Sequence, residues 1–99
     1  MVIGVLRVLL AIEGAHDLKT KRRALRKVVD RLRARYNISV AEVGDNELWN
    51  RSLVGASVVS NSGPHANSML DKAQDTIHEI AEVEVLDSEL EIIHFGEEP

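Results

Sequence analysis

The first patterned segment of the chain, residues 2–12, predicts a strand with two apolar faces. Its even positions are apolar with Gly4 among them, and of its odd positions only Arg7 is clearly polar. Successive side chains of a strand point to opposite faces, so a strand that is apolar on both faces belongs in the middle of a sheet. We therefore expect residues 2–12 to form a central strand.

A helical pattern follows over residues 18–35. Asp17 precedes it, and its carboxylate can accept hydrogen bonds from the backbone N–H groups two or three residues on, as an N-cap does. Spacings of three and four residues predict a buried stripe made of Leu25, Val28, Val29, Leu32 and Tyr36. Asn37 ends the helix, and residues 38–43 alternate as a second strand.

The second half of the chain begins with the turn residues 44–46 and a connector that contains Leu48 and Trp49. A third strand is expected over residues 53–60, paired with the second as an antiparallel hairpin. Ser62 or Gly63 then caps a second helix that has Pro64 in its first turn. Its buried face is predicted to comprise Ala66, Met69, Leu70, Ala73, Ile77 and Ile80.

The acidic residues 83–95 predict a final strand, bulged near Asp87 and Ser88, and residues 97–99 read as a C-terminal tail. The resulting order is β-α-β-β-α-β. Right-handed crossovers place both helices on one face of the sheet. We predict a single domain over residues 1–96, of the α+β class, with a ferredoxin-like βαββαβ fold, a four-stranded antiparallel sheet and two helices on one face.

The charges are strongly segregated along the chain. Nine of the twelve Lys and Arg residues lie in residues 19–35, where Asp30 is the only acid. From residue 37 onward only Arg51 and Lys72 are basic, against thirteen Asp and Glu. The net charge of −4 therefore hides a charge dipole.

The chain contains no cysteine, which excludes a disulfide framework and any thiolate chemistry. The apolar residues 2–6 have no basic residue before them and are interrupted by Arg7, so they predict a buried strand and not a signal peptide. The stretch is also too short to span a bilayer. A cytoplasmic protein without membrane contact is expected.

Three segments resemble the YlxP-like family of small bacterial proteins, whose domain has no known function. The first two are residues 2–6, which open the chain, and residues 18–22, which enter the first helix. The third runs from Val40 through Leu48 and Trp49 to Asn61. Asp17 and Thr20 stand where the family often has Ser and Glu, so a reciprocal capping box is not fully available.

The resemblance implies a ferredoxin-like fold and no established catalytic or binding residues. It also implies a link to translation, because genes of relatives often lie beside genes for translation initiation and ribosome maturation.

The basic helix is the main functional candidate. Phosphate recognition needs several long cations on one accessible surface. We expect RNA or a ribosomal particle to be contacted by Lys19, Lys21, Arg22, Arg23 and Arg26. The alternative is a solvated helix whose charge is neutralised, by Asp30 on the same helix or by the acidic last strand.

The chain has only three aromatic residues, Tyr36, Trp49 and Phe95, and none lies inside the first or third strand. A platform that stacks RNA bases on the sheet is therefore not expected. Trp49 is expected to pack over the sheet edge and anchor its connector, with a contact role as the alternative. An apolar patch on the open sheet face would favour a homodimer, with an interface made of Ile3, Val5, Leu9 and Trp49.

No residue pattern indicates catalysis, and we expect no enzyme activity, no cofactor and no metal. The four histidines, at positions 16, 65, 78 and 94, show no close metal-ligand spacing. Ser62 and His65 lie near a helix start that could hold an anion, but ordinary capping explains these residues. Nothing local positions a base on a nucleophile.

Overall fold

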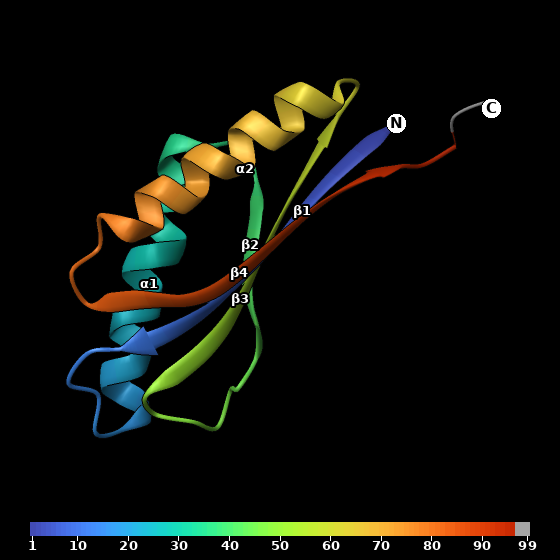
Figure 1. The fold of residues 1–99 in the computed structure, drawn as a ribbon. Coiled ribbons are helices and arrows are strands. Elements are labelled where there is room, and N and C mark those ends of the chain that lie inside the picture. The colour runs from blue at the N-terminus through green and yellow to red at the C-terminus, as the bar shows by residue number, and fades with distance from the viewer. Residues whose placement is uncertain (97–99) are drawn as a thin grey trace.

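The computed structural model describes residues 1–96, and the tail predicted over residues 97–99 lies outside the described residues. Figure 1 shows a twisted sheet with both helices on the same side. The elements are β1 Val2–Ile12, α1 Leu18–Arg35, β2 Ser39–Gly44, β3 Arg51–Ser60, α2 Gly63–His78 and β4 Val83–His94. The strands follow the order β2-β3-β1-β4, and all neighbours are antiparallel. The predicted ferredoxin-like α+β fold is confirmed.

The central position predicted for β1 is also confirmed. β1 lies between β3 and β4, so that Leu6 is opposite Ala56 on one side and Leu90 on the other. Its even-numbered residues are buried, whereas its odd-numbered residues are half-buried apart from the exposed Arg7. The odd positions belong to the face that carries no helix, which we call the open face.

The core fills the space between the sheet and the two helices. Its helical part comes from the predicted stripes, with Leu25, Val28 and Leu32 of α1 facing Leu70 and Ile77 of α2 in one cluster. Of the remaining predicted residues, Ala66, Ala73 and Ile80 also belong to the buried cluster, and Val29, Tyr36 and Met69 are partly buried against it. Tyr36 also joins the two helices, because its hydroxyl donates to Lys72 O at 3.1 Å and lies 2.8 Å from Thr76 Oγ1.

Both helices begin at the residues that the sequence predicts. Asp17 Oδ1 accepts from the Thr20 backbone N–H at 2.7 Å, and Ser62 Oγ accepts from the His65 backbone N–H at 3.2 Å. These bonds satisfy donors that a helix start otherwise leaves without an intrahelical acceptor. The Ser62 contact is the capping that we expected for that loop.

The strands differ from the prediction in three places. β3 begins at Arg51, two residues earlier than expected, because the long β1 continues to pair with it as far as Ala11 and Arg51. The register of β1 with β4 shifts between Leu9 and Leu10, which leaves Leu86 as the extra residue of a bulge. This bulge lies directly before the predicted position at Asp87 and Ser88. A second shift, between β2 and β3, falls at Val43.

Candidate nucleic-acid interface

Four cations of the first half of α1 line one surface hollow. Lys19, Arg22, Arg23 and Arg26 surround a volume of about 290 Å³. Their spacings of three, four and seven residues place them on one face of the helix. The face lies at the lower end of α1 in Figure 1, beside the loops β1–α1 and β2–β3. Four of the five residues predicted to contact RNA are therefore brought together.

None of these four cations forms an ion pair with a carboxylate within residues 1–96. Asp30, the local acid that could have neutralised Arg26, has no ion pair in the same part of the chain. Lys19 does act on Asp17 at the helix start. The pKa of Asp17 is lowered first by the hydrogen bonds from Thr20 and to a smaller extent by the charge of Lys19. These four exposed cations thus present their positive charge to solvent.

The second half of α1 is different because acids near the end of α2 reach it. Lys27 Nζ lies 3.0 Å from Glu82 Oε1, and Arg35 Nη1 lies 3.0 Å from Glu79 Oε2. The hydrogen bond from Lys27 is the main reason that the pKa of Glu82 is lowered. Acids that follow α2 in the sequence therefore neutralise part of this half, and they belong neither to α1, as Asp30 does, nor to the acidic last strand.

The prediction for Lys21 is wrong. Only 1% of this residue is exposed, and its Nζ lies 2.9 Å from Glu42 Oε2 and 2.6 Å from Asp45 O. Glu42 Oε2 also accepts from Ser52 Oγ at 2.7 Å, so the buried ammonium belongs to a closed network with β2 and β3. The sequence carried a signal for this position, since Lys21 precedes Leu25, Val28 and Leu32 by four, seven and eleven residues on the buried stripe.

The residues predicted for a protein interface lie in two different parts of the structure. Ile3, Val5 and Leu9 lie on the open face, half-buried by their neighbours in the sheet. Trp49 lies in the connector between β2 and β3 and is 55% exposed, which is not the packing expected of an anchor. Its side chain instead leaves apolar surface open to contact, as in the alternative interpretation.

The open face includes apolar residues that the sequence analysis missed. Val43 and Val59 are 58% and 68% exposed, and Ile93 is directly opposite Ile3 on β4. Alternation along β3 could have placed Val59 there, because it shares a face with Leu53, which pairs with Leu9. Val43 could not be placed in this way, since it belongs to the β2 bulge.

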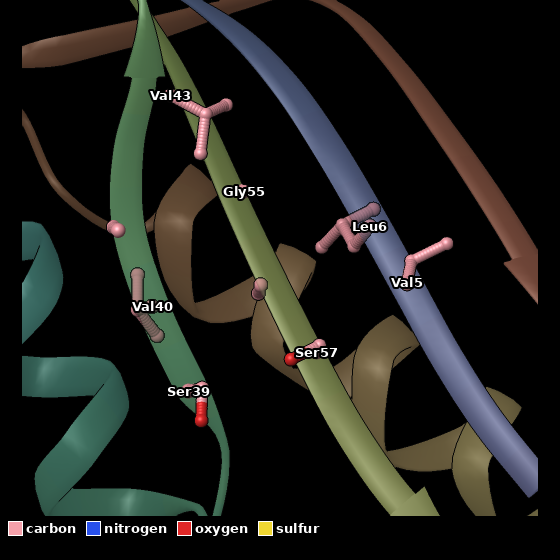
Figure 2. Close-up of a pocket in the computed structure, with 9 residues that line it drawn as sticks. Val5, Leu6, Ser39, Val40, Val43, Gly55 and Ser57 are labelled. Carbon is pink, nitrogen blue, oxygen red and sulfur yellow. The ribbon is translucent and has the colours of Figure 1, made fainter.

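A shallow trough crosses this face over β2, β3 and β1 (Figure 2), with the helix α2 behind the sheet. Its volume is about 330 Å³, and Gly55 leaves its floor without a side chain. Val43 rises on one side, so that a Cβ added at Gly55 would lie 3.1 Å from Val43 Cγ1. Val5 rises on the other side. The trough is therefore mainly apolar, with Ser39 and Ser57 also in its lining, and it is open to solvent.

Other kinds of site are not indicated by the described part of the chain. Residues 1–96 contain no group of three or more His, Cys, Asp or Glu side chains placed to hold a metal ion. Within the same residues, neither helix has the length and apolar character needed to cross a membrane.

The fold and its exposed basic face define the chain as a small ferredoxin-like α+β protein. A solution NMR structure of the de novo designed protein LFR1 1, with ferredoxin fold, is similar with a TM-score of 0.51 and 13% identity. The match covers 98% of this chain and 87% of the designed chain. At this identity the similarity concerns the fold alone.

The family is shown by sequence. The model of the family described as "Protein of unknown function (DUF503)" matches residues 3–90, and the chain belongs to this family. The chain is also 30% identical over 73 residues to the "Uncharacterized protein YlxP" of Bacillus subtilis (strain 168). That match covers 74% of this chain and 79% of the relative. The YlxP-like family expected from the sequence is thereby confirmed.

Proposed function

We propose that the protein is a non-catalytic cytoplasmic accessory factor that binds RNA, free or in a ribosomal particle, through Lys19, Arg22, Arg23 and Arg26. The observation that carries the proposal is the hollow of about 290 Å³ whose lining consists of these four cations. Long basic side chains around one hollow can each approach a phosphate of the same backbone segment. Lys21 is not one of the proposed RNA contacts, because its buried ammonium group is paired with Glu42.

The positions of the aromatic residues favour contact with the RNA backbone over recognition of the bases. Tyr36 follows α1, Trp49 lies in a connector and Phe95 follows β4, so no strand of the described sheet presents an aromatic ring for base stacking. Four exposed cations on one helical face can contact backbone phosphates without reading the bases. We therefore expect binding to depend on RNA shape and on salt, with little dependence on sequence.

The test is a titration of a fluorescently labelled RNA hairpin, followed by anisotropy at several salt concentrations. With four phosphate contacts, the logarithm of the association constant should fall with the logarithm of salt with a slope of about −3 to −4. The variant Lys19→Gln/Arg23→Gln/Arg26→Gln should lose about three units of that slope and bind at least about tenfold more weakly at low salt.

The matched control is Arg31→Gln/Arg51→Gln/Lys72→Gln. It removes the same charge from three exposed residues that form no ion pair within residues 1–96. Affinity and slope should stay close to those of the parent protein. An equal loss of RNA affinity in the two triple variants would show that only the net charge of the protein matters and would contradict the proposed site. The absence of binding at low salt would refute the proposal.

A protein-interaction module is the second candidate, favoured by the exposure of Val43 and Val59 beside Ile3, Val5 and Leu9. Packing of two open faces would bury this apolar surface in a homodimer. Sedimentation velocity at low and high salt measures the mass directly. A dimer that persists in high salt and is lost in Val5→Glu would support this candidate, and a strict monomer would count against self-association.

A further inference from the structure

Three acidic residues of β4 border the apolar part of the open face. In the register of the sheet, Val5 is opposite Glu91, Arg7 is opposite Glu89 and Leu9 is opposite Asp87. Residues directly opposite each other in an antiparallel pair project on the same side. The open face is therefore apolar over β3 and the adjoining parts of β1 and β2, and acidic along β4.

One carboxylate of this row is neutralised, and two are not. Arg7 Nη2 lies 2.8 Å from Glu89 Oε2. Asp87 accepts only from the backbone N–H of Ser88, at 2.9 Å, and neither Asp87 nor Glu91 forms an ion pair within residues 1–96. Two exposed negative charges thus remain at the border of the apolar surface.

Arg7 and Glu89 line two small hollows, and their charges offset each other as an ion pair. One hollow, of about 120 Å³, is also lined by Leu9, Leu53, Ser88 and the unpaired Asp87. The second, of about 200 Å³, is also lined by Val5, Leu6 and the unpaired Glu91. Lys and Arg side chains combine an apolar stem with a charged tip, so each hollow matches such a side chain. Asp87 and Glu91 are four residues apart along the strand, which corresponds to about 13 Å.

We propose that the open face binds a cationic amphipathic helix of a partner protein. Its apolar stripe covers the trough over Gly55, and two Lys or Arg residues about two turns apart enter the hollows and meet Asp87 and Glu91. A helix satisfies its own backbone hydrogen bonds, so it can pack on the face of a sheet without leaving polar groups unpaired. Two helical turns span about 11 Å, and the long side chains cover the remaining distance.

Charge complementarity favours this occupant over a second copy of the chain. If two open faces pack with β4 over β4, the acidic rows of both copies meet. If they pack with β4 over β2, each row covers Ser39, Ala41 and Val43, which offer no positive charge. A cationic helix instead supplies a counter-charge to both Asp87 and Glu91.

The test uses a synthetic helical peptide with a leucine stripe and lysines at positions i and i+7, added to the ¹⁵N-labelled protein. Amide shifts in the NMR spectrum should concentrate on the open face, at Val5, Leu9, Gly55, Asp87 and Glu91, and leave the first turns of α1 unchanged. A peptide with glutamates in place of the two lysines should bind at least about tenfold more weakly.

Two variants separate the acidic and the apolar contributions. Asp87→Asn/Glu91→Gln should weaken peptide binding about three- to tenfold, because two exposed charge contacts are lost. Gly55→Leu fills the trough without changing charge and should also weaken binding. The control Glu47→Gln/Asp75→Asn removes the same charge from two exposed residues away from the open face and should leave affinity unchanged.

Thermal melting of each variant confirms that it is folded before binding is measured. Equal weakening in the control and in Asp87→Asn/Glu91→Gln would overturn the proposal, as would shifts centred on α1. A free protein that is already a dimer through its open face would overturn it too, because the second copy would then be the occupant. RNA binding through α1 does not enter this test, so the two proposals can fail separately.

Discussion

The ammonium group of Lys21 lies 2.9 Å from Glu42 Oε2, whereas the next residue, Arg22, extends into solvent. Adjacent positions of a helix point about 100° apart, so one of them can face the core while the other lines the basic hollow. Removal of one partner of a buried ion pair leaves the other partner without compensation. The two neighbouring cations are therefore expected to have separate roles, one in stability and one in binding.

We predict that Lys21→Met lowers the free energy of unfolding by about 1–3 kcal/mol, because Glu42 loses its cation while the aliphatic packing is kept. Urea denaturation measures the change. RNA affinity of the folded variant should remain that of the parent protein. In Lys21→Met/Glu42→Gln part of the loss should be recovered, since the uncompensated carboxylate is gone. A loss of RNA affinity as large as that of the Lys19, Arg23 and Arg26 variant would contradict the assignment.

The lowered pKa of Asp17 predicts that the stability of the protein falls at acidic pH. Its pKa is lowered from 3.8 in the folded protein, first by the backbone hydrogen bond from Thr20 and then by the Thr20 side chain. A carboxyl group with a lowered folded pKa stabilises the protein above its unfolded pKa, and this contribution is lost as the pH falls through the folded value. The loss attributable to Asp17 is therefore expected below about pH 3.8.

Urea denaturation of the parent protein and of Asp17→Asn, repeated from pH 6 to pH 2.5, isolates this contribution. Asn is also a good N-cap but does not titrate, so the variant should lose less stability in the acidic range. A titration of the Asp17 carboxyl followed by NMR should give a pKa below 3.8. Identical acid dependence in the two proteins would refute the prediction.

At the scale of the elements, a glycine on the helix-covered face of the sheet and one on the open face have different surroundings. Gly4 faces α2, and a Cβ added there would lie 2.8 Å from Leu70 Cδ1, 3.1 Å from Val58 Cγ1 and 3.3 Å from Ala66 Cβ. Gly55 faces the open side, where the atoms within reach of a new Cβ belong to the exposed Val43. The close packing of β1 on α2 therefore depends on the missing side chain of Gly4.

Gly4→Ala should lower the free energy of unfolding by about 1–2 kcal/mol, because an extra methyl group forces packed side chains apart. Gly55→Ala, the matched control in the same sheet, should change it by less than about 0.5 kcal/mol, since the unfolded chain loses entropy and the exposed Val43 side chain can move away from the new methyl group. Chemical denaturation of the two variants gives both values. Greater destabilisation by Gly55→Ala than by Gly4→Ala would contradict this view of the sheet.

At the scale of the whole molecule, opposite charges are collected on different surfaces. The first turns of α1 carry four cations without ion pairs in the described chain, and the open side of β4 carries a row of carboxylates. Three other cations form ion pairs within the described chain, Lys27 with Glu82, Arg35 with Glu79 and Arg7 with Glu89. The surface proposed to bind RNA and the surface proposed to bind a partner helix are therefore separate and opposite in charge. One molecule of the protein is expected to bind both partners at the same time.

Most of the fold could be predicted from the sequence because its signals are local. The Asp17 cap, the spacing of Leu25, Val28 and Leu32, and the doubly apolar residues 2–12 each act over a few neighbouring positions. Together they determined the bounds of α1, the central place of β1 and the order of all six elements. Bulges were harder to locate, since the extra residue Leu86 depends on how β4 registers against β1.

The sequence by itself also determined that nearly all the positive charge would belong to one helix. Only the tertiary structure decided which of those charges remain available to a partner. Lys21 and Asp45 are 24 residues apart, and Lys27 and Glu82 are 55 residues apart, yet each pair is joined by a hydrogen bond. The charge of a side chain is a property of the residue, but its neutralisation depends on which distant groups the folded chain brings within a few ångströms.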